Sequence, residues 1–513
     1  MTALLVFPPL GSQVISTSDE ARFPLLARDA IARGAWFDAE VRDKVYRNKP
    51  PLYPWSIAAV SLPGGRVTEG TAQAPVAAAA VGAALFTFLL GDRLFTRRAG
   101  LWAALILATS YSFFGHSQKL LPDMLVVAFA TAAGYAFWRA MAEPPGRGAL
   151  IGFYAALAFG VFAKGPVGLL PLLAAAAWLW IERGPRGLRR LWSPPGAAVF
   201  AVVTLSWLGA FLAVGTRSYV ETVLWKNWLD WFLGVPLPSR LANLAVDAVV
   251  GFLPWTVVAP LAFAQAFRAW RASAAVRFAV LWFAVPLFVI ALSANQRTRY
   301  LLSIYPGLAL LVAWWADAHG AVRTTLGRVL AWGSLLGAGG GVALLALSPP
   351  FGLERVSWEL LPLIAGTALL GLALWRGLQA GRPALLVQGV VAGMVVILGS
   401  GIWLHNAWAN RTEDFKGLSA RVERHVGGAA VAVFGGRFFP LDFYLGRDLR
   451  RIRTEEELEA YLARPERPAV VVAEGSWRAL QGKVSQDVRV LDRMRVRGQE
   501  MLVVRADSVP STR

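Results

Sequence analysis

The feature that most constrains the fold is a series of apolar runs between residues 71 and 404, each about 17–22 residues long. A helix needs roughly 20 apolar residues to cross the hydrocarbon core of a bilayer. The whole chain has 513 residues, of which 56% are hydrophobic and only 16% are charged. This is more apolar than an average soluble domain. The sequence therefore predicts an all-α polytopic membrane protein over residues 1–408.

Counting the runs predicts about twelve membrane spans. Their approximate limits are 71–91, 99–117, 121–141, 149–164, 166–181, 196–214, 246–266, 275–293, 300–317, 324–347, 359–377 and 383–404. Lys164-Gly165-Pro166 must separate the fourth run from the fifth, because proline does not continue a helix.

The loops between the runs alternate strictly between arginine-rich and arginine-poor segments. Short cytoplasmic loops carry an excess of Lys and Arg, so the arginine-rich loops are predicted to be cytoplasmic. The same rule accounts for much of the net charge of +19. Nucleic-acid binding is therefore not expected, since no basic helix with interleaved aromatic residues stands out. The segments predicted to be external are 19–55, 116–122, 164–166, 217–247, 295–299 and the tail after residue 406.

The N-terminal segment poses a topological problem. If residues 1–70 form an external loop before the first complete span, a helix should precede them. Met1–Leu10 is apolar but too short to span a bilayer, and it lacks the basic start of a cleavable signal. We expect that a first helix is missing and that its last turns remain as Ala3–Phe7.

After about Trp408 the charged residues become dense and the apolar runs become short. Strand-like runs are Ala429–Phe434, Ala469–Ala473, Val488–Leu491 and Met501–Val504. Thr454 followed by Glu457 predicts the start of a short helix over Glu455–Ala463. The sequence thus predicts a small external α/β domain over 409–513. A role as scaffold or lid is favoured over catalysis, because the domain has no nucleophile–base motif.

The first external loop is predicted to contain amphipathic helices. Ser18 or Asp19 is the expected N-cap of a helix that continues to about Arg33. Apolar residues recur in this helix at a spacing of three or four, namely Phe23, Leu26, Ala27, Ala30 and Ile31. One apolar stripe of this kind favours a helix that lies on the membrane surface. Asp19 is either a capping residue or a carboxylate aimed into an external cavity, as general base or hydrogen-bond acceptor.

Three further charged residues lie where spans begin or end. Lys49 precedes Pro50-Pro51, whose rigid backbone would hold it at headgroup level, for a lipid phosphate or for ordinary snorkelling. Lys164 lies between two spans with no arginine beside it, which favours a phosphate contact. Asp123 follows Pro122 at the start of a span, where it either complements the helix dipole or serves the reaction.

The segment 217–247 mixes aromatic and cationic residues, including Arg240. Part of this pattern is explained by the enrichment of tryptophan at the membrane interface. Alternatively, the segment covers a lipid-linked substrate. Arg297, Arg299 and Tyr300 form another cationic group at the start of a span. Planar guanidinium groups bind phosphate well, so this group is a candidate phosphate clamp.

Several motifs occur together in a fixed order. They are Asp19-Glu20-Ala21-Arg22, Lys49-Pro50-Pro51-Leu52-Tyr53, Pro122-Asp123-Met124, Lys164-Gly165-Pro166, Leu253-Pro254-Trp255 and Arg299-Tyr300-Leu301-Leu302. The ordered set resembles the bacterial ArnT-like glycosyltransferases, which are related to the protein O-mannosyltransferases and have the GT-C membrane fold. The resemblance covers about residues 15–310, and the later helices and the tail match only in layout.

The resemblance implies thirteen spans, which agrees with twelve and a missing first helix. It implies transfer of a sugar from a polyprenyl-phosphate-linked donor at the periplasmic face of the bacterial inner membrane. The acceptor would be lipid A, another envelope glycan or lipid, or a protein. Matching the motifs implies Asp19 and Asp123 as catalytic residues and Lys49 and Lys164 as contacts of the lipid phosphate. Arg240 and Arg299 are further candidates for that phosphate, and Glu20, Arg22 and Tyr53 are expected in the substrate loop.

Two departures from the family pattern argue against a bound metal. Asn48 stands where a glutamate is common, and the loop 217–247 has no histidine. Cysteine is absent and the four histidines form no local metal motif, so neither a disulfide nor a metal or other cofactor is predicted. We expect a monomer.

Two other functions remain alternatives. A transporter or flippase of lipid-linked sugars would predict inverted repeats and charged residues at the bilayer midplane. The sequence shows neither. An inactive relative with a binding role is kept open by Asn48.

Overall fold

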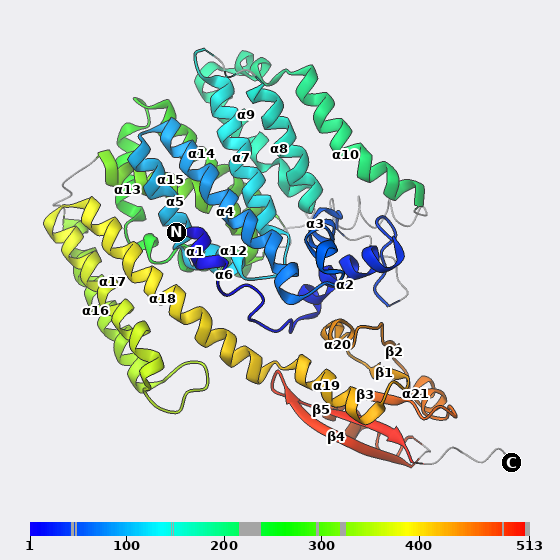
Figure 1. Ribbon diagram of the computed structural model, residues 1–513. Helices are drawn as coiled ribbons and strands as arrows, with labels where there is room; N and C mark the ends of the chain where they lie inside the picture. The colour runs from blue at the N-terminus through cyan, green and yellow to red at the C-terminus, as the bar shows by residue number, and fades with distance from the viewer. Residues whose placement is uncertain are drawn as a thin grey trace. The chain divides into compact units, whose positions relative to one another are not determined.

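The computed structural model describes residues 1–42, 46, 49–144, 146, 148–214, 238–293, 297–318, 325–484 and 487–507 (Figure 1). The chain divides into two compact units. The first comprises Met1–Leu10, Arg47–Ser56 and Gln73–Leu404. The second comprises Gly11–Tyr46, Ile57–Ala72 and His405–Arg513.

The first unit is helical. Its α-helices, some of which extend into the second unit, are α1 (Thr2–Val6), α3 (Leu52–Ser61), α4 (Glu69–Leu94), α5 (Arg97–Ala108), α6 (Tyr111–Ser117), α7 (Asp123–Met141), α8 (Ala149–Lys164), α9 (Leu170–Arg183), α10 (Pro194–Val214), α12 (Pro238–Gly251), α13 (Ala259–Ala269), α14 (Ala274–Leu292), α15 (Tyr305–Ala318), α16 (Thr325–Leu347), α17 (Leu361–Ala380) and α18 (Pro383–Thr412). Within the described residues, seven helices are long and apolar enough to cross a membrane. The chain is a multi-pass membrane protein.

The remaining predicted spans correspond to shorter or interrupted helices. The structure therefore differs from the prediction of twelve continuous spans. The run 99–117 is divided into α5 and α6. The reason is local: the Thr109 hydroxyl donates to the Leu105 carbonyl at 2.7 Å, and the Ser110 hydroxyl donates to the Leu107 carbonyl at 2.8 Å. These side chains compete with the backbone for the last carbonyls of α5.

The run 246–266 is likewise divided, into α12 and α13. A short 3-10 helix, η5 (Trp255–Val257), lies between them. Pro254 precedes it and has no N–H to continue α12.

Helices α7, α8 and α10 pack side by side (Figure 1). The turn that follows α8 depends on glycine. Gly165 has φ 83°, a conformation that side chains rarely adopt, and it reverses the chain directly after Lys164. A Cβ atom on Gly168 would lie 2.3 Å from the carbonyl carbon of Gly160. Only glycine allows this close approach, which positions Lys164 at the end of α8.

The second unit contains a five-stranded sheet in the order β2-β1-β3-β5-β4. The strands are β1 (Val431–Phe434), β2 (Arg450–Ile452), β3 (Ala469–Ala473), β4 (Val488–Val496) and β5 (Gln499–Ala506). β1 pairs in parallel with β2 and β3, whereas β5 is antiparallel to β3 and β4. The short helices are α19 (Phe415–Val426), α20 (Phe439–Tyr444), α21 (Glu455–Leu462) and α22 (Glu474–Leu480). The predicted α/β composition is confirmed, and β2 is an additional strand.

The sheet has an apolar core on each face because its inner strands are buried on both sides. Val433 and Val471 belong to one core cluster, whereas Ala432 and Val470 belong to the other. This alternation follows from the two-residue period of a strand. The predicted capping of α21 is confirmed, since Thr454 Oγ1 accepts from the Glu457 N–H at 3.2 Å.

Helix α2 (Ser18–Arg33) also belongs to the second unit, and its environment differs from the prediction. The apolar stripe was expected on the membrane surface. Phe23, Leu26 and Ala30 are instead 5%, 3% and 2% exposed within the protein. Helix α2 packs on α20, where Phe439 and Phe443 contact its apolar side. An amphipathic stripe does not distinguish lipid from protein as its partner, because both bury apolar area.

Candidate functional site

A buried ion pair joins two predicted site residues in the first unit. Asp123 is the first residue of α7, and Lys164 is the last residue of α8. Because α7 and α8 are neighbours that run in opposite directions, these ends meet. Lys164 Nζ donates to Asp123 Oδ1, and the two side chains are only 7% and 5% exposed. Isolated buried charges are costly, and each of these side chains has the other as its partner.

Residues of the 3-10 helix η6 (Thr298–Ser303) also lie next to the Asp123–Lys164 pair. Lys164 Nζ lies 4.4 Å from the centre of the Tyr300 ring, a cation–π contact. The Arg299 guanidinium carbon lies 6.0 Å from the same ring. Within the described residues, Arg299 Nε is buried and has no hydrogen-bond partner. A buried donor of this kind needs an acceptor, such as an oxygen of a ligand.

The charges around Lys164 do not balance. Asp123 acts on it as an attractive charge, whereas Arg299 and Lys49 act as repulsive charges. Among the described residues that act on Lys164 in this way, two are cations and one is a carboxylate. Positive charge in excess, placed where a span ends, is suited to an anion such as a phosphate group.

Arg240 is placed on the first turn of α12, and its side chain is exposed. Helix α12 contacts η6, since Thr298 donates to Asp247 Oδ2 at 2.7 Å. Residues 215–237, which hold most of the aromatic loop, lie outside the described residues, and so does Asn48. The proposals for Arg240 and for the aromatic loop stay predictions.

The start of α2 carries the other predicted site residues. The N-cap is Thr17, not Ser18 or Asp19. Thr17 Oγ1 accepts from the Glu20 N–H at 3.2 Å and donates to Glu20 Oε2 at 2.8 Å. This is a capping box, and the spacing Thr17-x-x-Glu20 is the sequence signal for it that our interpretation passed over. Glu20 therefore serves the helix end.

Asp19 is therefore not the N-cap of α2, which was one of the two roles predicted for it. Its side chain is 55% exposed and lies 3.4 Å from the Arg22 guanidinium. Arg22 in turn lies over the rings of Tyr46 and Phe439, at 5.2 and 5.9 Å from their centres. An exposed carboxylate beside a held arginine is able to accept a proton or a hydrogen bond from a hydroxyl group.

Arg42 and Asp442 form a second buried pair, which the sequence did not predict. Arg42 Nε donates to Asp442 Oδ1 at 2.8 Å, and a second guanidinium nitrogen donates to Oδ2. Arg28 donates to the Asp442 carbonyl and pairs with Asp448, both at 2.8 Å. These contacts connect the α2 segment with α20. The partners lie 400 residues apart in sequence, so no local pattern could have revealed them.

Tyr53 is fully buried within α3. A side chain without exposure is more typical of packing than of a substrate loop. The structure brings Asp123, Lys164 and Arg299 together around Tyr300 in the first unit, and Lys49 lies near enough to act on Lys164 electrostatically. Asp19, Glu20 and Arg22 lie together in the second.

Comparisons with known proteins identify similar chains. The family model of dolichyl-phosphate-mannose-protein mannosyltransferases matches residues 48–211, which include Lys49, Asp123 and Lys164. Two similar proteins are undecaprenyl phosphate-α-4-amino-4-deoxy-L-arabinose arabinosyl transferases. The one from Pseudomonas fluorescens is 27% identical over 338 residues, which cover 64% of this chain and 60% of that protein. The one from Pectobacterium carotovorum is 28% identical over 436 residues, covering 77% and 75%.

A similar solved structure is that of ArnT from Cupriavidus metallidurans bound to undecaprenyl phosphate. It matches with a TM-score of 0.80 and 17% identity, and the alignment covers 100% of this chain and 98% of that one. The likeness extends over the helical part and the small sheet, and it shows a common fold.

Proposed function

We propose that the chain, an ArnT-like membrane glycosyltransferase with the GT-C fold, takes its sugar from an undecaprenyl-phosphate carrier and transfers it at the periplasmic face of the inner membrane. The names of the relatives favour 4-amino-4-deoxy-L-arabinose as the sugar. Lipid A is the first acceptor to test, followed by other envelope glycans or lipids and by proteins. The arginine distribution of the loops supports the orientation.

The observation that carries the proposal is the positive excess around the Asp123–Lys164 pair. In the reaction, the bond between the anomeric carbon and the phosphate oxygen breaks, and the carrier phosphate gains negative charge. Lys49, Lys164 and Arg299 would stabilise that charge. Preorganised donors aimed at developing charge are usually the largest contribution to catalysis. Asp123 would orient Lys164 through their hydrogen bond.

The acceptor hydroxyl attacks the anomeric carbon and loses its proton. Asp19 is our proposed acceptor of that proton, because it is exposed and is not used as a helix cap. Arg22, with Tyr46 and Phe439 against it, would hold Asp19 in place. No step of this scheme needs a metal ion.

The test is transfer by the purified full-length protein in detergent. Undecaprenyl-phosphate-linked 4-amino-4-deoxy-L-arabinose is incubated with lipid A, and both the modified lipid and the released undecaprenyl phosphate are measured. We expect both products. Release without a modified acceptor would point to a different acceptor, and no release from this donor or from other polyprenyl-phosphate sugars would contradict the proposal.

The role of Asp19 is tested by Asp19→Asn, which keeps the shape of the side chain but removes the base. We expect transfer to be abolished and expression to be unchanged. Glu20→Gln is the matched control, because Glu20 is engaged in the capping box. Near-normal transfer by Asp19→Asn would remove Asp19 from the mechanism.

A transporter remains the alternative from another class. Its charged residues should lie at the midplane of the bilayer. Asp123 and Lys164 lie instead at the ends of their helices. Proteoliposomes that move the donor lipid between leaflets without releasing its sugar would favour transport. A chain that binds the donor but neither moves it nor releases its sugar would be an inactive relative.

A further inference from the structure

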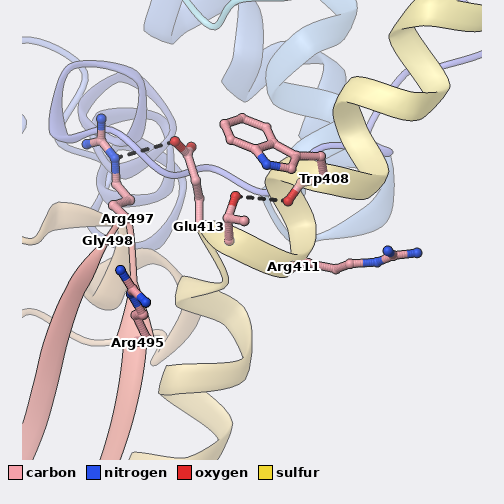
Figure 2. A pocket seen from close by; sticks show the side chains of 7 residues that line it. Trp408, Arg411, Glu413, Arg495, Arg497 and Gly498 are labelled. Carbon is pink, nitrogen blue, oxygen red and sulfur yellow. Dashed lines mark hydrogen bonds and ion pairs between the residues drawn. The ribbon is translucent and has the colours of Figure 1, made fainter. Parts of the chain in front are cut away.

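A pocket of about 570 Å³ lies in the second unit, where α18 ends and the hairpin of β4 and β5 turns (Figure 2). Its charged lining residues are Arg411, Glu413, Arg495 and Arg497. The volume is within the range of small-molecule sites. The transfer mechanism above uses none of these residues.

The hairpin turn is held against the end of α18. The Arg497 N–H donates to the Thr412 carbonyl at 2.7 Å. Arg497 and Gly498 have φ 54° and 76°, and they connect the paired residues Val496 and Gln499. Such a two-residue turn favours Asn or Gly at its first position. An arginine there is strained, so its presence indicates that the guanidinium has a use besides forming the turn.

The pocket carries an excess of positive charge. Arg497 Nε lies 3.6 Å from Glu413 Oε1, and these side chains are 48% and 21% exposed. A long, exposed pair of this kind contributes little and is easily exchanged. Across the described part of the chain, neither Arg411 nor Arg495 forms an ion pair. Figure 2 shows Arg495 and Arg497 extending from the hairpin and Arg411 from the end of α18.

The pocket also lies at a defined depth along α18. The apolar run of this helix ends near Leu404, and Trp408 and Arg411 follow within two turns. A rise of 1.5 Å per residue places Arg411 about 10 Å beyond the apolar run. The headgroup region of a bilayer is about 5–8 Å thick on each side, so the Arg411 backbone lies slightly beyond its outer edge. Trp408 is of the residue type that is enriched at this interface.

We infer that this pocket binds the phosphate group of an anionic phospholipid headgroup. Guanidinium groups bind phosphate through two parallel hydrogen bonds. Arg495 and Arg497 would hold the phosphate oxygens, Arg411 would add positive charge at the edge, and Trp408 would contact the glycerol portion. A neighbouring pocket of about 350 Å³ shares Arg497 and extends the basic surface. The inference does not depend on the proposed transfer.

The test measures binding of phosphatidylglycerol with a fluorophore on one acyl chain to the full-length protein in a neutral detergent. The variant Arg495→Gln/Arg497→Gln removes both hairpin cations. We expect its dissociation constant to rise at least about tenfold, since each hydrogen bond to a charged group typically contributes a factor of ten or more. Donor sugar is absent, so the result is independent of any transferase activity.

The matched control is Arg489→Gln/Arg493→Gln, which removes the same charge from β4 outside the pocket. We expect a change of about twofold or less, because screened charges at a distance act weakly. Equal losses in both variants would mean general attraction to anionic lipid and would overturn the inference, as would unchanged binding. Displacement by inorganic phosphate at the concentration of the lipid would identify a site for free phosphate instead.

Arg497→Asn guards against a failure of the double variant to fold. Asparagine suits the first position of the turn, so the hairpin should be as stable as before or more so. We expect weaker lipid binding with an unchanged or higher melting temperature. Binding as strong as in the original chain would contradict a role of the Arg497 side chain.

Discussion

Two buried ion pairs in this protein have similar chemistry and different surroundings. Asp123 and Lys164 are 5% and 7% exposed, and Asp442 and Arg42 are 0% and 8% exposed. Among the described residues, Arg42 pairs with Asp442 and Arg28 pairs with Asp448. Asp442 Oδ1 also accepts from the Leu449 N–H at 2.8 Å.

Around Lys164, by contrast, Lys49 and Arg299 act as repulsive charges beside the attraction of Asp123. A pair that only stabilises the fold gains nothing from further cations nearby. We propose that the charges around a buried pair, more than its burial, separate a pair that holds the fold from one that serves a ligand.

The largest expected effect follows Lys164→Met. Transfer should fall by at least about 10²–10³, because the departing phosphate loses a preorganised donor. The free energy of unfolding should also fall by about 3–5 kcal/mol, because Asp123 is left buried and unpaired. The control is Asp123→Asn/Lys164→Met, measured by thermal unfolding and by the transfer assay. We expect the double variant to regain stability but not transfer; normal transfer in either would contradict the phosphate site.

Arg42→Met should affect stability alone. It leaves Asp442 buried and unpaired, so the free energy of unfolding should fall by about 3–5 kcal/mol. At a temperature where the protein is folded, kcat should change by about twofold or less. Arg42→Met/Asp442→Leu, which removes both charges, should recover part of the loss. A fall in kcat as large as that of Lys164→Met would erase the distinction between the two pairs.

Arg299→Gln sharpens the comparison, because it removes a cation and leaves the Asp123–Lys164 pair intact. Transfer should fall about tenfold to a hundredfold, through loss of about 1.5–3 kcal/mol of charged hydrogen bonding to phosphate. The melting temperature should change little. Arg297→Gln is the matched control, since Arg297 is exposed in the same segment. Equal losses in both variants would indicate general electrostatic attraction to the donor and no specific contact.

Much of the fold could be predicted because its signals are local. Apolar runs marked the helices, and β-branched runs marked β1, β3, β4 and β5. The three residues of β2 include two arginines and carry no such signal. Thr109 and Ser110 gave no clear sign that they would end α5. The capping box of Thr17 and Glu20 was readable, and it was missed because Asp19 is an equally good capping type.

The site could be predicted residue by residue but not as a set. Lys164 stood out because it lies between two spans with no arginine beside it, and Asp123 because it follows Pro122 at the start of a span. Their contact depends on the packing of α7 against α8, which periodicity does not report. Arg42 and Asp442 are ordinary charged residues in sequence, and only the folded chain gives them a common role.

The smallest expected effect concerns Tyr444, which lies in the same unit as the Arg42–Asp442 pair. Burial raises the pKa of this phenol, whose oxygen accepts from the Ile15 N–H at 2.8 Å. The unfolded chain ionises near pH 10 and the folded chain only at higher pH. The stabilisation is therefore fully present below about pH 10, and above it falls by up to about 1.4 kcal/mol per pH unit. Tyr444→Phe should remove this dependence and cost about 1 kcal/mol at neutral pH. Thermal unfolding between pH 8 and 11 measures both the pH dependence and the loss of stability, and Tyr111→Phe, at an exposed tyrosine, is the control. If stability falls with pH equally in Tyr444→Phe and in the original chain, Tyr444 does not cause the dependence.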